Sequence, residues 1–480
     1  MEYNQKLKLL IDGKWTDSSQ RDTLPVIDPA TEKILSHLPI ADENDMERAL
    51  VSSKKGFQIW SKWTPLRRQA VMLKTVEIMR KRSDDIAKTL TMEMGKTLRE
   101  SKQEINQVIE TIIWCAEEGK RTYGRIIPSR DGHARQMVFK EPIGPVAAFV
   151  AWNFPGGNVI RKVASTLAAG CSIIIKPSEE TPGTAVAIGE CFMDAGLPQG
   201  VLNIIFGVPD KISKYLLKSS IPKAVTFTGS VDVGKHLQSL ASETLKKCTL
   251  ELGGHAPVII CDDANIDKVL NKIAIWKFRN SGQVCISPSR FFVQEASYKK
   301  FVDGFVAIAN QINLGSGLEE NSDMGPLIFE KQVHKMERFV ENAKSLGGKI
   351  NCGGEKFGEI GFFFKPTVIT DIPETAKILN EEPFGPLVPI IPFKTLEEAI
   401  EKSNSLSVGL ASYIFTENQK NAHFLGNNLD VGIVCVNHTI VSVPEAPFGG
   451  FGESGYGKEN GIEGLESFLR TKYITEIPNI

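Results

Sequence analysis

Apolar and polar positions follow a helical period in the first quarter of the chain. Between residues 42 and 118 apolar side chains recur every three or four positions among charged ones, as in residues 45–50 and 76–80. This spacing collects the apolar side chains on one face of a helix and leaves the opposite face charged. The pattern therefore predicts a helical opening segment.

From residue 145 onward the pattern changes to short apolar runs that alternate with helical stretches. The runs are rich in Val, Ile and Phe and cover residues 146–150, 172–175, 201–205, 224–227 and 257–261. Runs of this length bounded by glycine or proline are typical of buried parallel strands, and the stretches between them are typical of crossover helices. The pattern predicts a doubly wound α/β lobe.

A second alternating region extends from residue 290 to residue 437. The two regions predict an α/β protein with two doubly wound lobes, and we expect an active site between them at the carboxyl ends of the strands. The polar stretch 121–141 fits neither lobe and is predicted to be a protruding hairpin. Residues 463–480 are predicted to be a second appendage.

Charge and composition exclude several classes of protein. The 480 residues include 56 Lys and Arg against 57 Asp and Glu, a formal net charge of −1, with 42% hydrophobic and 24% charged residues. A nucleic-acid-binding domain is usually strongly basic, and a disordered chain is poorer in apolar residues. No apolar run approaches the ~18 residues of a membrane span, and the first residues lack a signal-peptide pattern. We expect a cytoplasmic protein with no nucleic-acid or membrane partner.

The eight cysteines and seven histidines show no metal-binding or disulfide pattern. No Cys-x-x-Cys, His-x-x-x-His or His-Glu-x-x-His sequence occurs. Because zinc sites and disulfide frameworks use regular spacings of this kind, we predict neither.

Two local features could carry chemistry. Cys285 follows a glycine in the polar sequence Gly282-Gln283-Val284-Cys285, and Glu251 follows an apolar run beside Gly253-Gly254. A cysteine in such a loop is either a nucleophile or an inert core residue, and a glutamate there is either a catalytic base, a helix cap or a surface carboxylate. Neither feature decides between its interpretations.

A third feature, residues 227–235, suits phosphate binding. It follows a predicted strand, and Gly229 permits close backbone approach where the free amides of the next helix begin. The segment nearly matches the P-loop pattern Gly-x-x-x-x-Gly-Lys-[Ser/Thr]. His236 stands where the magnesium-binding hydroxyl should be, so a P-loop nucleotide-binding protein is a distant alternative.

Seven motifs in order resemble the aldehyde dehydrogenase superfamily over essentially the whole chain. They are Trp152-Asn153-Phe154-Pro155, Lys176-Pro177-Ser178-Glu179, Phe227-Thr228-Gly229-Ser230, Glu251-Leu252-Gly253-Gly254, Gly282-Gln283-Val284-Cys285, Glu382-Pro383-Phe384-Gly385-Pro386 and Pro447-Phe448-Gly449-Gly450. The resemblance implies a Rossmann-like NAD-binding domain (1–120 and 142–252), a catalytic domain (253–455) and a small β oligomerisation appendage (121–141 and 463–480). It also implies a homodimer or homotetramer.

The resemblance assigns three catalytic roles. Cys285 would be the nucleophile that forms a thiohemiacetal and then a thioester, which suits a thiol. The side-chain amide of Asn153 and the backbone N–H of Cys285 would stabilise the oxyanion. Glu251 would activate the water that hydrolyses the thioester, with a pKa raised by its apolar neighbours.

The resemblance also assigns the cofactor contacts. Lys176 and Glu179 would hold the adenosine ribose, Trp152, Gly229 and Ser230 would lie at the pyrophosphate, Glu382 would bind the nicotinamide ribose, and Leu252 and Phe384 would pack against the cofactor. A carboxylate such as Glu179 accepts from a ribose 2′-hydroxyl and repels a 2′-phosphate, so NAD is favoured and NADP remains possible. An exposed pair of glutamates at a helix start is the alternative interpretation of Glu179 and Glu180.

Two arginines suggest the substrate class. Arg161 and Arg279 stand where relatives that act on neutral aldehydes carry aromatic residues and where succinate-semialdehyde dehydrogenases carry arginines. Two guanidinium groups could clamp a distal carboxylate; two solvated helix arginines are the alternative. Val443 stands where some of those enzymes carry a carboxylate-binding serine, and Ser287 replaces the second cysteine of a redox switch.

We therefore predict NAD(P)-dependent oxidation of an aldehyde to an acid, with succinate semialdehyde as the expected substrate. Glutarate semialdehyde, sulfolactaldehyde, lactaldehyde and an aromatic aldehyde remain alternatives. A coenzyme A-acylating relative is disfavoured because Glu251 is present, and a catalytically silent scaffold is disfavoured by the set of Cys285, Glu251 and Asn153.

Overall fold

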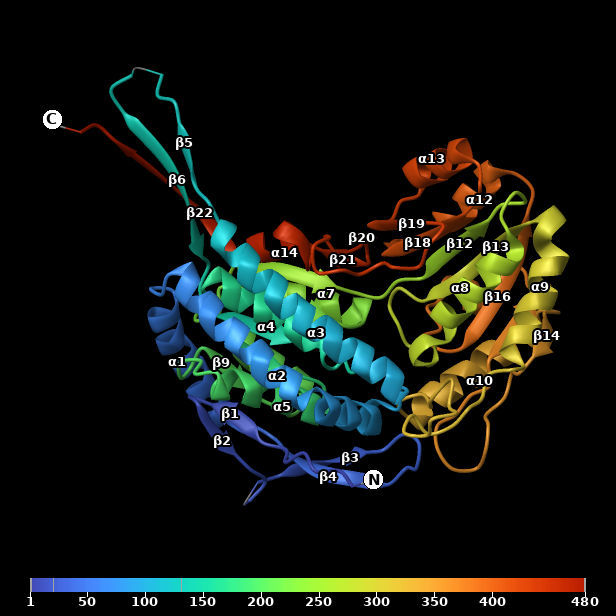
Figure 1. Cartoon of the computed structure of the whole chain (residues 1–480), viewed down its shortest axis with the longest axis horizontal. Helices are drawn as coiled ribbons and strands as arrows, with labels where there is room; N and C mark the ends of the chain where they lie inside the picture. The colour runs from blue at the N-terminus through green and yellow to red at the C-terminus, as the bar shows by residue number, and fades with distance from the viewer. Residues whose placement is uncertain (1, 20, 131, 479–480) are drawn as a thin grey trace.

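Two α/β lobes lie side by side and a narrow β arm projects from one of them (Figure 1). The computed structural model describes residues 2–19, 21–130 and 132–478. Among these described residues no helix is long and apolar enough to cross a membrane.

The first lobe is built on an eight-stranded sheet. Its strands, in spatial order, are β2 (Lys14–Thr16), β1 (Leu9–Ile11), β9 (Leu202–Ile204), β8 (Ile173–Lys176), β7 (Val146–Phe149), β10 (Ala224–Thr228), β11 (Lys247–Glu251) and β21 (Gly455–Tyr456). The five strands from β9 to β11 run parallel, as predicted for a doubly wound lobe, and β1, β2 and β21 pair antiparallel at the edges.

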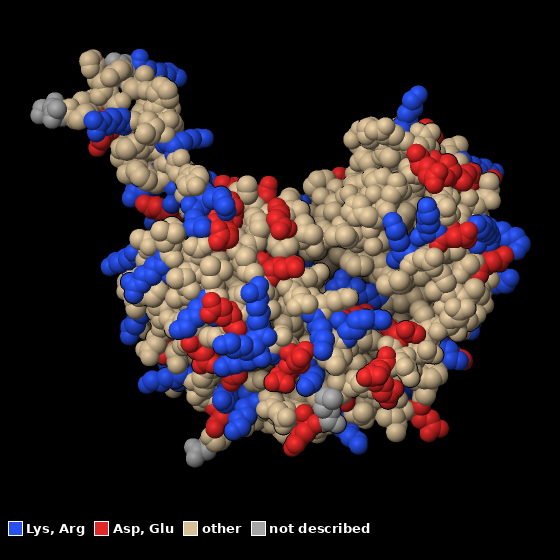
Figure 2. Space-filling model, in the orientation of Figure 1, with Lys and Arg blue, Asp and Glu red and all other residues tan. Residues whose placement is uncertain are grey.

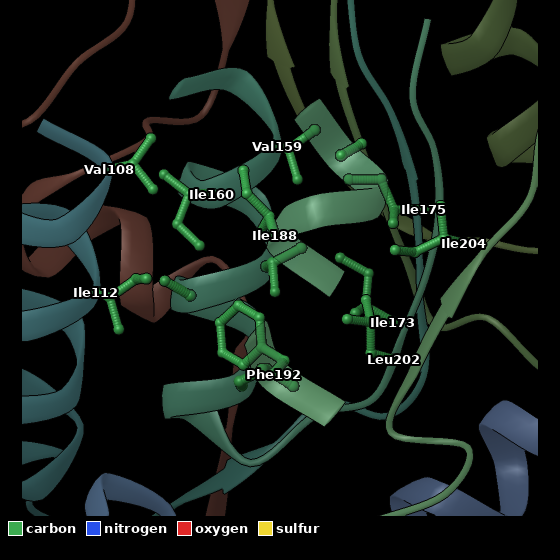
Figure 3. Close-up of a cluster of buried hydrophobic side chains, with 14 of the residues drawn as sticks. Val108, Ile112, Val159, Ile160, Ile173, Ile175, Ile188, Phe192, Leu202 and Ile204 are labelled. Atoms are coloured by element: carbon green, nitrogen blue, oxygen red, sulfur yellow. The ribbon is translucent and has the colours of Figure 1, made fainter. Parts of the chain in front are cut away.

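Helices cover both faces of this sheet because successive strand residues point to opposite sides. One face packs chiefly against α2 (Pro65–Met94), α3 (Leu98–Glu118), α4 (Gly157–Ala169) and α5 (Pro182–Asp194); the other packs against α1 (Glu43–Trp60), α6 (Pro209–Lys218) and α7 (Val231–Ser242). Figure 3 shows the first interface, where apolar side chains of α3, α4 and α5 meet those of β8 and β9.

The predicted helical opening segment forms α1, α2 and α3. Each begins at a residue suited to capping: Asp42 and Thr97 form capping boxes with Asp45 and Glu100, and Thr64 precedes a proline at the first helical position. The sequence analysis did not predict the strands before these helices, which include the hairpin of β3 (Thr23–Ile27) and β4 (Ile34–Pro39).

The second lobe is built on a seven-stranded sheet. Its strands, in spatial order, are β14 (Lys349–Cys352), β15 (Thr367–Thr370), β16 (Leu387–Phe393), β13 (Pro288–Gln294), β12 (Ala256–Ile260), β18 (Ala411–Phe415) and β19 (Ile433–Val436). All neighbours are parallel except β14 and β15.

This second sheet is also covered on both faces. One face packs against α8 (Ile266–Phe278) and α9 (Glu295–Ala309), and the other packs against α10 (Glu330–Ser345), α11 (Lys377–Asn380), α12 (Leu396–Ser403) and α13 (Gln419–Asn428). The remaining short elements are η1 (Gly119–Arg121), η2 (Arg279–Gly282), β17 (Val408–Gly409), β20 (Phe451–Gly452) and α14 (Gly461–Glu466).

The arm is a three-stranded antiparallel sheet of β5 (Arg125–Ile127), β6 (Arg135–Pro142) and β22 (Leu469–Glu476). β22 pairs with β6 along its whole length, from Leu469 opposite Pro142 to Glu476 opposite Arg135. The two segments that fitted neither lobe therefore meet in one sheet. On the face shown in Figure 2 acidic and basic side chains are interspersed, as the near-zero net charge suggests.

The two lobes offer opposite strand ends to the space between them. In the first lobe the candidate residues follow the carboxyl ends of the strands, as expected: Asn153 follows β7, and Glu251 ends β11. In the second lobe the expectation was wrong, because Cys285 precedes β13 and Glu382 precedes β16. The second lobe thus contributes the loops that enter its strands.

Candidate active site

A cavity of about 300 Å³ lies where the lobes meet. Its wall combines side chains of α3 and α4 from the first lobe with α8, η2 and residues 440–444 from the second. Among the residues that line it are Cys285, Phe154, Arg161, Trp276, Arg279 and Ser442.

The loop that carries Cys285 has an unusual backbone. Asn280 and Ser281 have φ values of 50° and 56°, and Gly282 has a φ of 75°, so three consecutive residues are left-handed. A Cβ at Gly282 would lie 2.2 Å from the carbonyl oxygen of Gly385, so this close approach requires glycine. Hydrogen bonds compensate for the strain: the Ser281 hydroxyl donates to the carbonyl of Gly325 at 2.7 Å.

The same loop is tied to the first lobe. Asn280 donates its side-chain amide to the carbonyl of Asn153 at 2.9 Å, and the backbone N–H of Asn280 donates to the Glu100 carboxylate at 2.9 Å. Both bonds cross the boundary between the lobes. They fix the distance between the two segments that carry Asn153 and Cys285.

Burial is the main influence on the Cys285 thiol. It raises the pKa of Cys285 to about 12, and the carboxylates of Glu251 and Glu382 add to the rise, whereas Arg161 opposes it. The thiol is therefore protonated at neutral pH in the ligand-free site. A base must remove the proton before the sulfur can act as a nucleophile.

The Asn153 side chain is buried and oriented by its neighbours. Its Nδ2 donates to the carbonyl of Gln283 at 3.2 Å, and its Oδ1 accepts from Asn158 Nδ2 at 3.1 Å. The N–H₂ end of the amide thus faces the loop of Cys285, which is the orientation that an oxyanion donor needs.

A buried ion pair that the sequence analysis missed holds the segment after Asn153. Lys96 Nζ donates to Glu104 at 2.7 Å and to the Asn153 carbonyl at 2.9 Å. The other carboxylate oxygen of Glu104 accepts from the backbone N–H groups of Gly156 and Gly157 at 2.9 and 3.0 Å. The pair fixes residues 153–157 from both sides.

Glu251 is a buried carboxylate without a hydrogen-bond partner among the described residues. Neither oxygen of its carboxylate is bonded, and burial together with the charge of Glu459 raises its pKa well above the usual value. Gly449 leaves the space that the carboxylate occupies, since a Cβ there would lie 2.5 Å from Oε1. Burial and the neighbouring negative charge therefore favour the protonated form of this carboxyl group, and both of its oxygens are free to bond a water molecule.

A second buried ion pair lies next to Glu251. Lys162 of α4 pairs with Glu459, and Lys162 Nζ also donates to the Thr228 hydroxyl at 2.7 Å. Sequence reasoning could not find this pair, because its members are 297 residues apart and neither stands in a recognisable motif. The pair adds both a positive and a negative charge to the surroundings of Glu251.

Lys176 and Glu179 form an ion pair at the carboxyl end of β8. Their Nζ and Oε1 atoms are 2.6 Å apart, and Glu179 accepts from the backbone N–H of Gly207 at 3.3 Å. Burial raises the pKa of Glu179, which Lys176 opposes. Glu179 is therefore not the exposed helix-start carboxylate of the alternative interpretation.

The turn between β10 and α7 contains only Gly229 and Ser230. The Gly229 N–H donates to the Glu251 carbonyl at 3.0 Å, and Ser230 caps α7 without a side-chain hydrogen bond. Leu252 is buried and packs against Gly234 of α7. The P-loop alternative is wrong, because residues 231–235 belong to the helix and Lys235 pairs with Glu453 instead of facing the turn.

On the second lobe Glu382 is half-buried. Burial raises its pKa to about 7, and its Oε1 has no hydrogen-bond partner among the described residues. Phe384 has a φ of 53° and packs edge-on against Trp152 with ring centres 5.5 Å apart. Across the described part of the chain no cluster of three metal-binding side chains occurs.

The two arginines of the cavity have different environments. Arg161 donates to the Ser442 hydroxyl at 2.7 Å and lies 4.0 Å from Glu459. Arg279 makes no side-chain hydrogen bond or ion pair with any described residue, and burial lowers its pKa. Among the described residues Arg279 is thus a cation of the cavity wall without a direct partner, and the charges of Glu100 and Glu104 partly oppose the effect of burial on its pKa. Val443 stands where some relatives carry a carboxylate-binding serine, and the adjacent Ser442 brings a hydroxyl to the cavity wall.

Comparison with known proteins identifies the family of the chain. The Aldehyde dehydrogenase family profile matches residues 15–474. The chain is 42% identical over 467 residues to a putative 4-(hydroxymethyl)benzenesulfonate dehydrogenase of Comamonas testosteroni, with 97% of each chain covered. It is 36% identical to an NADP(+) succinate-semialdehyde dehydrogenase of Escherichia coli, covering 97% of this chain and 96% of the relative.

Solved structures agree with the sequence relatives. Betaine aldehyde dehydrogenase of Staphylococcus aureus in complex with NAD+ superimposes with a TM-score of 0.96 at 31% identity, covering 99% of this chain and 96% of that structure. A family profile over nearly the whole chain, relatives above 30% identity and a shared fold lead to one conclusion. The chain belongs to the aldehyde dehydrogenase family.

Proposed function

We propose that this aldehyde dehydrogenase oxidises a short aldehyde that carries an anionic group, and that succinate semialdehyde is the first substrate to test. The observation that carries the proposal is the Arg279 guanidinium, which lines the cavity of Cys285 with no protein partner among the described residues. The guanidinium is half-buried, and Glu100 and Glu104 stabilise its charge without forming an ion pair with it. An anionic ligand would bond directly to the N–H groups that no protein atom accepts from.

The proposed chemistry begins at Cys285. The thiol proton passes to water, the sulfur bonds to the aldehyde carbon, and the Asn153 amide and the Cys285 N–H stabilise the resulting oxyanion. A nicotinamide cofactor, when bound, accepts the hydride that leaves this carbon. The thioester that remains is attacked by water, whose proton Glu251 accepts, and the acid is released as the thiol is restored.

The residues present fit a dinucleotide. The unpartnered Oε1 of Glu382 offers an acceptor for a ribose hydroxyl, and the unused hydroxyl of Ser230 lies in the turn that begins α7. Trp152 and Phe384 pack against each other, and by the family resemblance they would contact the cofactor together with Gly229 and Leu252. Glu179, held by Lys176, favours NAD because a carboxylate repels a 2′-phosphate. The E. coli relative is named for NADP(+), so the test includes NADP as well as NAD.

A second candidate is an aryl aldehyde with an anionic substituent. The 42% identical relative is named for a benzenesulfonate substrate, and the cavity wall includes the rings of Phe154, Trp276 and Phe448. Flat rings pack well against aromatic side chains. In both candidates Arg279 would bind the anionic end.

The test is absorbance of reduced nicotinamide with a panel of aldehydes. The panel contains succinate semialdehyde, glutarate semialdehyde, 4-formylbenzenesulfonate and neutral aldehydes of matched length, each with NAD and with NADP. The proposal requires kcat/KM to be higher for anionic aldehydes than for their neutral counterparts. Equal or lower values would contradict it.

We also propose that the arm assembles the protein into a homodimer or homotetramer. Its exposed apolar side chains include Ile126, Phe139 and Tyr473. An arm of three strands cannot bury these residues against its own lobe, so a second copy would cover them. Sedimentation of the wild type and of an Ile126→Glu, Tyr473→Glu variant tests this, since only the variant should be monomeric.

A further inference from the structure

The guanidinium of Arg279 lies between two aromatic rings. Its central carbon is 4.9 Å from the ring centre of Trp276 and 5.1 Å from that of Phe154. Both rings belong to the cavity wall that also contains Cys285. Aromatic faces attract a cation through their negative electrostatic potential, and the attraction is stronger away from water.

This way of holding an arginine leaves its hydrogen-bond donors unused. Arg290, by comparison, is buried with its guanidinium donating to the carbonyls of His255, Lys402 and Ser403. Arg161 donates to Ser442 and has Glu459 nearby. Within the described chain Arg279 makes no such hydrogen bond or ion pair, although the charges of Glu100 and Glu104 stabilise it from a longer distance. The rings therefore orient it while its N–H groups stay available to a ligand.

Trp276 is itself held in place. Its Nε1–H donates to the hydroxyl of Tyr413 at 2.7 Å, and that hydroxyl donates to the carbonyl of Ile286 at 2.6 Å. Ile286 follows Cys285 directly. The indole ring is thereby fixed relative to the loop that carries the nucleophile, and the position of Arg279 follows from the position of the ring.

We propose that Trp276 is a positioning residue for Arg279 and, through it, a determinant of the selectivity for anionic aldehydes. The inference rests on the proposed function, in which Arg279 binds the anionic group. Trp276 needs no contact with that group. Phe154 supplies the second ring but adjoins Asn153, so Trp276 is the residue whose replacement leaves the oxyanion segment intact.

The experiment compares two substrates of the same chain length, one with a carboxylate and one with the neutral methyl ester. We use succinate semialdehyde and its methyl ester, and measure kcat and KM for each in the wild type, Trp276→Leu and Trp276→Phe. In Trp276→Leu the ratio of kcat/KM, acid over ester, should fall about tenfold or more, chiefly through KM for the acid. Trp276→Phe keeps an aromatic face and should retain most of the ratio.

The matched control is Ile275→Ala, one residue earlier on the same helix. The Ile275 side chain is 75% exposed, so this variant should leave the ratio unchanged.

If the role of Trp276 were purely structural, Trp276→Leu would lower kcat/KM equally for the acid and the ester. The ratio of the two would then be unchanged, and this result would overturn the inference. Arg279→Gln separates this failure from failure of the proposed function. If Arg279→Gln removes the preference for the acid while Trp276→Leu keeps it, anion recognition stands and the role of Trp276 is wrong. If Arg279→Gln also keeps the preference, both proposals are wrong. Should Trp276→Leu fail to fold, Trp276→Gln also removes the aromatic ring, and a ratio in that variant equal to the wild-type ratio would contradict the inference as well.

Discussion

The side-chain amide of Asn153 reaches across the boundary between the lobes and donates a hydrogen bond of 3.2 Å to the carbonyl of Gln283. Asn158 bonds the other end of the amide, so the N–H₂ group cannot turn away from the loop of Cys285. The donor is therefore oriented before substrate binds. Such preorganisation avoids the cost of reorienting dipoles during the reaction.

Asn153→Ala should lower kcat by about 10²–10³ for every aldehyde, because an oxyanion donor acts in the transition state whatever the substrate. Binding of NAD, measured by fluorescence titration, should stay close to the wild-type value. A variant that keeps its kcat and loses only substrate affinity would assign Asn153 to binding instead.

The half-buried thiol of Cys285 should react slowly at neutral pH. The pKa of Cys285 is raised to about 12, so at lower pH the thiolate fraction increases about tenfold with each unit by which the pH rises. The rate of alkylation by iodoacetamide, followed by mass spectrometry of the peptide that contains Cys285, should therefore keep rising through about pH 10. A plateau near pH 8 would mean that the thiol is already ionised in the ligand-free enzyme.

Glu251→Gln should release one equivalent of reduced nicotinamide per active site and then stall, because only thioester hydrolysis needs the base. In the wild type the raised pKa of Glu251 means that its basic form is gained as pH rises, so kcat should increase with pH. Replacing Glu459 by Gln removes a like charge and should shift that rise to lower pH. Stopped-flow absorbance measures the burst, and loss of the burst itself would place Glu251 in thiol activation.

The candidate residues that could be predicted from the sequence are those that stand within one short motif. Cys285 stands in a recognisable loop sequence, and the placement of Glu251 at a strand end follows from the apolar run before it. The pair of Lys162 and Glu459 could not be predicted, because only the packing of α4 against the C-terminal segment brings them together. The same holds for the contact of Arg161 with Ser442, which spans 281 residues.

The orientation of the second lobe was not predictable for a related reason. Apolar runs identify parallel strands but do not say which end of a sheet faces its neighbour. The general rule places sites at carboxyl ends, yet Cys285 and Glu382 precede β13 and β16. The first sheet follows the rule, whereas the candidate residues of the second sheet lie in the loops that enter its strands.

Glu179→Ser should increase the use of NADP relative to NAD. The change removes a carboxylate near the 2′ position and frees Lys176, now paired with it at 2.6 Å, to bind a phosphate. NAD activity should fall at the same time, because an acceptor for the ribose hydroxyl is lost. The measured quantity is the ratio of kcat/KM for the two cofactors; a wild type that already prefers NADP would refute the role given to Glu179.

Arg161 and Arg279 should contribute unequally to anion recognition. Arg279 has no partner among the described residues, whereas Arg161 is bonded to Ser442 and lies 4.0 Å from Glu459, which offsets part of its charge. Charged hydrogen bonds are worth ~1.5–3 kcal/mol, so Arg279→Gln should lower kcat/KM for succinate semialdehyde by roughly tenfold or more. Arg161→Gln should have the smaller effect on this substrate, and both variants should leave kcat/KM for butanal nearly unchanged.

Because both groups would bind one carboxylate, the double variant should lose less than the sum of the two free-energy changes. The four enzymes are compared on both aldehydes. Parallel losses on the two substrates would reject carboxylate recognition, and a larger loss in Arg161→Gln would show that pairing with Ser442 and Glu459 orients that arginine more than it neutralises it.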